Sequence, residues 1–178
     1  MHWLTYWPST YLQVFATAFV LSAACMPIAI FLLRRFNIMD AVAANKIHER
    51  PVPRGGGIVI FFAFAVAVMW PGYRSHPFNG VMIGAFLCLV LGGLDDLTGG
   101  KIPGFWKLLM LAAVTLILHR YGVRLNLFHS RALDLLFTLV WIVGVTSAFN
   151  GTDNMDGLAG GIAIIVSAAY LFIAVQAW

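Results

Sequence analysis

Apolar residues run along this chain in six long stretches, each separated from the next by a short polar or glycine-containing connection. The stretches lack the strict alternation of a barrel strand, and backbone polar groups inside a membrane must be satisfied within the segment. A hydrocarbon core about 30 Å thick takes roughly 20 helical residues. The predicted spans are residues 11–33, 56–71, 78–94, 105–119, 133–149 and 158–178. This pattern predicts an all-α polytopic membrane helix bundle of about six transmembrane helices, in one domain over residues 1–178.

Composition agrees with a membrane protein. The 178 residues are 61% hydrophobic and only 10% charged, with a mean hydropathy of +0.89, outside the range of soluble domains. The formal net charge of +4 would prompt a search for a nucleic-acid face in a soluble chain. Five of the eleven Lys and Arg residues fall in one connection, residues 34–54, so the bias indicates topology, and membrane lipid rather than nucleic acid is the expected partner. Cys25 and Cys88 lie inside apolar stretches without metal-ligand spacing, which argues against a disulfide or a zinc site.

The distribution of charge predicts an orientation. The connection over residues 34–54 is the most basic one and is therefore expected to face the cytoplasm, with the N-terminus outside. Alternating spans then put the connections 95–104 and 150–157 on the same inner side. The arginines left on the outer side are Arg74, Arg120, Arg124 and Arg131. Of the seven acidic residues, only Asp134 lies near the outer end of a predicted helix.

The first inner connection contains NKIHERPVPRGGG, residues 45–57. Lys46, His48 and Arg54 can present positive charge to phosphate oxygens, and the three following glycines can present backbone N–H groups. Pro51 and Pro53 stiffen the segment by fixing φ. The open alternative is a plain positive-inside topology signal.

The second inner connection reads LGGLDDLTGGKIPG, residues 91–104. Asp95 and Asp96 are adjacent carboxylates at the end of an apolar helix, where repulsion and desolvation call for a compensating cation. Magnesium is the natural candidate, because it prefers hard oxygen ligands and binds through one or two carboxylates plus substrate phosphates. In the alternative interpretation, the two acids cap the following turn or face water.

The third inner connection reads FNGTDNMDGLAGG, residues 149–161. Asp153 and Asp156 would share one face of a helical turn, and Asn150 would extend that stripe by three residues. Such a stripe could bind a metal or position a proton acceptor, although an ordinary polar loop is the open alternative. Glycine pairs at the inner helix ends permit close approach of the backbone to a ligand, or serve helix packing alone. Together the three connections suit a reaction between a lipid-borne phosphate and a nucleotide-linked phosphate, aided by magnesium and basic side chains.

The segments KIHERPVPRGGG, LGGLDDLTG and NGTDNMDGLAGG occur in this order and resemble the polyprenyl-phosphate N-acetylhexosamine-1-phosphate transferase family, glycosyltransferase family 4. The first segment resembles the subgroup that uses UDP-N-acetylglucosamine or a related UDP-sugar. The resemblance implies a Mg²⁺- or Mn²⁺-dependent transfer of sugar-1-phosphate to undecaprenyl phosphate, with release of UMP. It also implies a bacterial inner membrane location, an active site facing the cytoplasm, and a role at the start of O-antigen, lipopolysaccharide or cell-wall glycan synthesis.

By motif position, the resemblance implies a role for each candidate residue. The catalytic residues are Asp95, Asp96 and Asp156; the metal ligands are Asn150, Asp153 and Asp96; the substrate-binding residues are Lys46, His48 and Arg54. Asp95 is the residue expected to deprotonate or orient the lipid phosphate.

Members of the resembled family are considerably longer, so the chain is expected to be the N-terminal part of a longer transferase. Two alternatives are an inactive truncated remnant and a noncatalytic membrane subunit, and a homodimer is left open. A transporter is less favoured, because it predicts acidic residues near the bilayer midplane on broken helices.

Overall fold

The computed structural model describes residues 9–36, 39–40, 52–53, 55–70, 72, 74–152 and 157–176. The helices are α1 (Ser9–Arg35), α2 (Gly56–Met69), α3 (His76–Leu97), α4 (Gly104–Arg120), α5 (Arg131–Thr152) and α6 (Leu158–Gln176). Between α1 and α2, the two-residue strands β1 (Met39–Asp40) and β2 (Val52–Pro53) pair antiparallel. The prediction of an all-α bundle with six helices is confirmed, and each helix begins and ends within a few residues of its predicted span.

Three helices in the described part are long and apolar enough to cross a membrane by length and composition. They are Tyr11–Arg35, His76–Leu97 and Arg131–Thr152. Two shorter apolar helices cover Gly56–Met69 and Leu158–Ile173. The fourth helix, α4, carries Lys107, His119 and Arg120 near its ends. The chain is therefore a multi-pass membrane protein whose helices differ in length.

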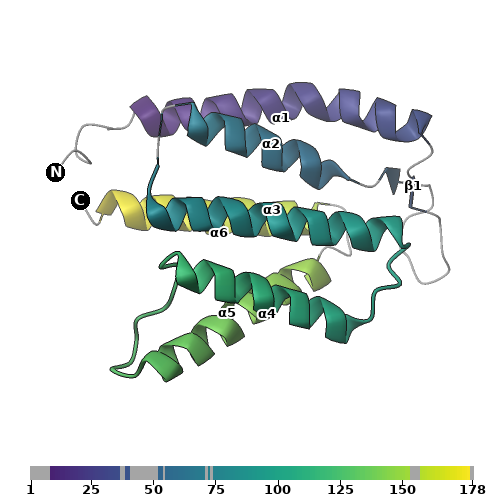
Figure 1. Ribbon diagram of the computed structural model, residues 1–178. Helices are drawn as coiled ribbons and strands as arrows, with labels where there is room; N and C mark the ends of the chain where they lie inside the picture. Colours follow the sequence, from purple (N-terminus) through teal and green to yellow (C-terminus); the bar gives the residue numbers. More distant parts are fainter. Residues whose placement is uncertain are drawn as a thin grey trace.

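Consecutive helices run in opposite directions, so their connections alternate between the two ends of the bundle (Figure 1). One end of the bundle, on the right in Figure 1, contains the β1–β2 pair and the α3–α4 turn. The last turn of α5 and the first turn of α6 also lie there, and we call it the site end. The α2–α3 and α4–α5 connections lie at the opposite, far end. The described parts of the three connections expected to share one face thus lie at one end of the bundle.

The contact between α3 and α4 depends on two glycines. A Cβ added at Gly80 would lie 2.3 Å from the Cβ of Tyr121, and one added at Gly84 would lie 2.8 Å from a methyl group of Leu118. Both glycines are buried, so only a residue without a side chain lets the helices approach this closely. His76 closes the far end of the pair, because its Nδ1 donates to the carbonyl oxygen of Tyr121 at 3.0 Å and the two rings stack.

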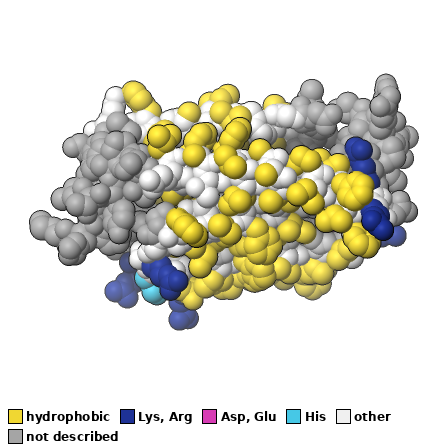
Figure 2. Space-filling model, turned by 90° about the horizontal axis from the view of Figure 1, so that it is seen from above, with side chains coloured by type: hydrophobic (Ala, Val, Ile, Leu, Met, Phe, Trp, Pro, Cys, Tyr) yellow, Lys and Arg dark blue, Asp and Glu magenta, His cyan; other side chains and the backbone are white. Residues whose placement is uncertain are grey.

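Most large apolar side chains point outward. On the face in Figure 2, apolar side chains cover the middle of the molecule, while Lys and Arg gather at its two ends. Among the described residues, the buried ones are few, and most are small: Ala63, Ala65, Ala67, Gly80, Gly84, Val114, Thr115, Asp134 and Thr138. Every residue of α6 from Ala163 to Ile173 is exposed. An apolar exterior over small buried residues is typical of helices that pack in lipid.

The single described acid at the far end has a structural role. The Oδ1 atom of Asp134 accepts hydrogen bonds from the backbone N–H groups of Leu127 (3.0 Å) and Phe128 (2.9 Å). One turn later, Thr138 Oγ1 accepts from the N–H of Leu125 at 3.1 Å and donates to the carbonyl oxygen of Asp134. These bonds satisfy the N–H groups of Leu125, Leu127 and Phe128, which lie in the irregular α4–α5 connection.

Candidate active site

The last turn of α3 ends in a glycine-dependent reversal that fixes the position of the paired acids. Gly99 and Gly100 have φ of 71° and 74°, in the left-handed region that favours glycine. Their N–H groups donate to the carbonyl oxygens of Asp96 (3.1 Å) and Asp95 (2.8 Å), and Thr98 Oγ1 also donates to the Asp95 carbonyl at 2.9 Å. The chain then turns back, so the first turn of α4 lies beside the last turn of α3.

This reversal brings a lysine to Asp95. Lys107 Nζ donates to Asp95 Oδ2 at 2.7 Å, and the two side chains are 35% and 24% exposed. Partial burial weakens solvent screening of such a pair. The cation beside Asp95 is therefore a lysine, so the side chain of Asp95 neither caps the turn alone nor simply faces water. The sequence indicated Mg²⁺ as the compensating cation, and that role stays a prediction.

The second oxygen of the same carboxylate is unused. Asp95 Oδ1 is buried and accepts no hydrogen bond from the part of the chain that the structure describes. A buried carboxylate oxygen without a donor is costly, so it calls for a cation or a donor at this place. The chemistry of the group thus fits a metal ion, or a substrate group that brings a proton.

Asp96 is exposed and follows Asp95 directly in the helix. Adjacent helical residues point about 100° apart, so the two carboxylates leave α3 in different directions. Asp95 faces α4, as its ion pair requires. Asp95 and Asp96 are consequently two separate groups at one helix end, and their carboxylates do not act as one pair.

Asn150 lies in the last turn of α5, at the same end of the bundle. It is exposed and lines a hollow of about 440 Å³ between α5 and α6, with Val145, Thr146, Phe149 and Ala159. The stretch that follows Asn150 contains two of the predicted site residues. The amide of Asn150 is therefore available at the surface of the bundle at this end.

Five predicted site residues lie outside the described residues: Lys46, His48, Arg54, Asp153 and Asp156. Their roles stay predictions. Within the described ranges, no three His, Cys, Asp or Glu side chains gather closely enough to hold a metal ion. The β1–β2 ladder pairs Met39 with Pro53 and Asp40 with Val52, so it joins the two ends of the first inner connection.

Lys107 was not singled out from the sequence. It lies in the first turn of the predicted span 105–119, where a charged residue in an apolar helix is a functional signal. That signal alone could have found it. Its partner could not have been named without the α3–α4 turn.

The acids of the described part lie at helix ends and in a strand, which does not fit the midplane acids expected of a transporter. They are Asp40 in β1, Asp95 and Asp96 in the last turn of α3, and Asp134 in the first turn of α5. No described acid lies near the middle of a helix. The argument against a transporter therefore holds for the described chain.

The chain is thus a membrane helix bundle with a polar site at one end, which contains acids, a lysine and an amide. The sequence profile of Glycosyl transferase family 4 matches residues 78–177, more than half of the chain. The chain belongs to this family, and the family resemblance inferred from the three sequence segments is confirmed. The matched region includes Asp95, Asp96, Lys107 and Asn150.

Curated relatives carry related names. The chain is 30% identical over 162 residues to the "Probable undecaprenyl-phosphate N-acetylglucosaminyl 1-phosphate transferase" of Bacillus subtilis, covering 83% of this chain and 45% of the relative. It is 28% identical to the undecaprenyl-phosphate alpha-N-acetylglucosaminyl 1-phosphate transferase of Thermotoga maritima, over 75% of this chain and 43% of the relative. It is 30% identical to the phospho-N-acetylmuramoyl-pentapeptide-transferase of Lactobacillus acidophilus, over 72% and 47%. The chain thus spans about half the length of these relatives. No solved structure matches the chain significantly.

Proposed function

We propose that this protein transfers N-acetylhexosamine-1-phosphate from a UDP-sugar to undecaprenyl phosphate and releases UMP. The observation that carries the proposal is the Asp95 carboxylate, which binds Lys107 through one oxygen and keeps the other buried without a donor. The names of the relatives supply the substrate classes. UDP-N-acetylglucosamine is the favoured donor, because the relatives from Bacillus subtilis and Thermotoga maritima are named as N-acetylglucosaminyl 1-phosphate transferases.

In the proposed reaction, an oxygen of the lipid phosphate forms a bond to the sugar-linked phosphorus of the UDP-sugar. The bond from this phosphorus to the bridging oxygen breaks, and UMP leaves with that oxygen. Asp95 Oδ1 is available to accept a proton from the lipid phosphate or to orient it. Lys107 fixes the carboxylate and offsets its charge, so that an anionic lipid phosphate can approach.

Magnesium or manganese is the proposed cofactor, held by Asp96, Asn150 and Asp153. Carboxylate and amide oxygens are hard ligands of the kind that Mg²⁺ takes in proteins. When bound, the metal would offset the charge of the diphosphate and favour departure of UMP. Asp156 is the proposed further catalytic acid of the same stretch.

The basic connection between α1 and α2 is proposed to bind substrate phosphates through Lys46, His48 and Arg54. The described strands of this connection, β1 and β2, lie at the site end of the bundle, which supports the proposal. In the sequence, seven of the eleven Lys and Arg residues fall in or beside the predicted inner connections. This bias supports a site end that faces the cytoplasm of a bacterial inner membrane. A role at the start of a cell-surface polysaccharide follows from the product, a lipid-linked sugar.

The test is transfer of labelled sugar into lipid. Membranes that contain the protein are supplied with labelled UDP-N-acetylglucosamine, undecaprenyl phosphate and Mg²⁺, and both lipid-linked label and UMP are measured. We expect both products with the unchanged protein, and loss of both with Asp95→Asn or Asp156→Asn. The far-end variant Arg124→Gln is the matched control and should retain activity. Absence of product from folded, membrane-inserted protein would favour a noncatalytic subunit instead.

A further inference from the structure

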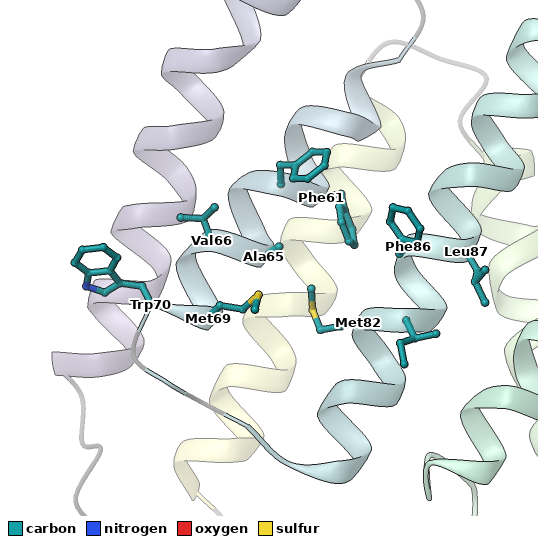
Figure 3. A pocket seen from close by; sticks show the side chains of 10 residues that line it. Phe61, Ala65, Val66, Met69, Trp70, Met82, Phe86 and Leu87 are labelled. Atoms are coloured by element: carbon teal, nitrogen blue, oxygen red, sulfur yellow. The ribbon is translucent and has the colours of Figure 1, made fainter.

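An apolar groove of about 700 Å³ runs between α2 and α3, away from the candidate active site (Figure 3). Its walls include Phe62, Val66 and Met69 from α2, and Met82 and Phe86 from α3. In Figure 3, the side chains of Met69 and Met82 point toward each other across it. Phe62, Val66 and Phe86 are each about half-exposed, so the groove opens at the lipid-facing surface of the bundle.

The groove is narrow toward the site end. There a Cβ at Gly57 would lie 3.6 Å from a methyl group of Leu89, and the rings of Phe61 and Phe86 are 5.9 Å apart. Toward the far end α2 and α3 diverge (Figure 1), and Trp70 at the end of α2 is 86% exposed. A slot that widens toward one membrane surface and contains flexible methionines suits an irregular hydrocarbon chain.

A cation lies in the chain connection at the wide end of the groove. Arg74 is in the short connection that joins the two groove walls, four residues after Trp70 and directly before Ser75, the N-cap of α3. Arg74 is exposed, and α3 begins here with the positive end of its helix dipole. Other cations of this end are Arg120, Arg124 and Arg131, all exposed. The only acid among the described far-end residues, Asp134, is buried and bonded to backbone amides.

We propose that this groove is a binding site for an anionic phospholipid of the leaflet at the far end. One acyl chain lies between α2 and α3, and the headgroup phosphate binds Arg74 at the wide mouth. The apolar walls match the chain, and the uncompensated positive charge matches the phosphate. The site is separate from the proposed transfer reaction and does not depend on it.

The geometry disfavours the tail of the polyprenyl substrate as the occupant. Asp95 follows Phe86 by nine residues on the same helix, which turns it about 180° to the opposite side of α3. The phosphate of that substrate is proposed to meet Asp95 at the site end, whereas the groove widens and carries its cation at the far end. A lipid whose phosphate belongs to the far surface fits both features.

The test measures which lipid the purified protein retains. The protein in detergent is mixed with equal amounts of a phosphatidylglycerol and a phosphatidylcholine with the same acyl chains, and native mass spectrometry counts the bound lipids. We expect preferential retention of phosphatidylglycerol, and a drop of about fivefold in that preference for Arg74→Gln. Arg124→Gln, which removes a far-end charge outside the groove connection, should change it by less than about twofold. Val66→Phe, which fills the groove and keeps Arg74, should lower retention of both lipids.

Three results would overturn the proposal. Equal retention of the two lipids would remove the headgroup site, and equal losses in Arg74→Gln and Arg124→Gln would indicate only a diffuse charge effect. Undecaprenyl phosphate that displaces phosphatidylglycerol from the unchanged protein, but not from Val66→Phe, would assign the groove to the substrate tail. Size-exclusion profiles and melting temperatures of all variants establish that each is folded.

Discussion

Lys107 and Asp95 join the first turn of α4 to the last turn of α3, with 2.7 Å between Nζ and Oδ2. The contact requires the left-handed turn at Gly99 and Gly100, because only a sharp reversal brings these two turns together. It leaves Asp95 Oδ1 buried and without a donor among the described residues. The ion pair therefore fixes the carboxylate and leaves its Oδ1 atom available to a substrate group or a metal ion.

Removing the ammonium group should impair transfer more than folding. Lys107→Met leaves the Asp95 carboxylate without its cation, and we expect sugar transfer to fall by about 100-fold, as for loss of a charge-stabilising group. Lys107→Arg should retain more activity than Lys107→Met, because the positive charge is kept. Lys101→Met changes an exposed lysine of the preceding turn and should stay within about twofold of the unchanged protein. Equal activity of Lys107→Met and Lys101→Met would contradict the proposed role.

Removal of divalent metal should stop the reaction. Excess EDTA is expected to abolish transfer of label into lipid, and added Mg²⁺ or Mn²⁺ should restore it, since both ions accept hard oxygen ligands. A binding readout separates the metal site from catalysis: Mg²⁺ should raise the melting temperature of the unchanged protein and raise it less for Asn150→Ala. Full activity in EDTA would rule out the proposed cofactor.

A methyl group at Gly80 should separate α3 from α4. The Cβ of Gly80→Ala would lie 2.3 Å from the Cβ of Tyr121, so we expect a destabilisation of about 1–3 kcal/mol, the usual cost of overpacking. Gly92→Ala in the same helix is the matched control, because no described atom lies within 4 Å of its added Cβ. Thermal unfolding in detergent measures both variants. A similar midpoint for the two would mean that the helices can shift apart without cost.

Loss of the Asp134 carboxylate should release the α4–α5 connection. Asp134→Ala leaves the N–H groups of Leu127 and Phe128 without their acceptor, and we expect a loss of about 0.5–1.5 kcal/mol for each of these part-buried hydrogen bonds. Asp134→Asn keeps an acceptor oxygen and should cost less. Limited proteolysis within residues 123–130 measures this release. The control is Asn126→Ala, which changes an exposed residue of the same connection. Unchanged protection in Asp134→Ala would show that the connection is held by other contacts.

The apolar pattern sufficed for the six helices, and alternation of their directions sufficed to bring Asp95, Asp96 and Asn150 to one end. It did not reveal Lys107, because that residue counts as part of a span until the α3–α4 turn gives it a partner. Nor did it reveal where glycine permits close packing. Gly92, Gly93, Gly160 and Gly161 have no described neighbour within 4 Å of an added Cβ, whereas Gly80 and Gly84 do. A glycine in a helix allows close packing, but only the position of the neighbouring helix shows which glycines are in such a contact.

The α3–α4 pair is fastened at both ends, by His76 and Tyr121 at the far end and by Asp95 and Lys107 at the site end. Between these attachments, Gly80 and Gly84 keep the two helices in close contact. Contacts at both ends restrain the two helices from sliding along each other. Under the proposed function, opening and closing around a substrate would then fall to the elements beside the pair, α2 and the ends of α5 and α6, and Asp95 would be the fixed reference point for the reacting phosphates.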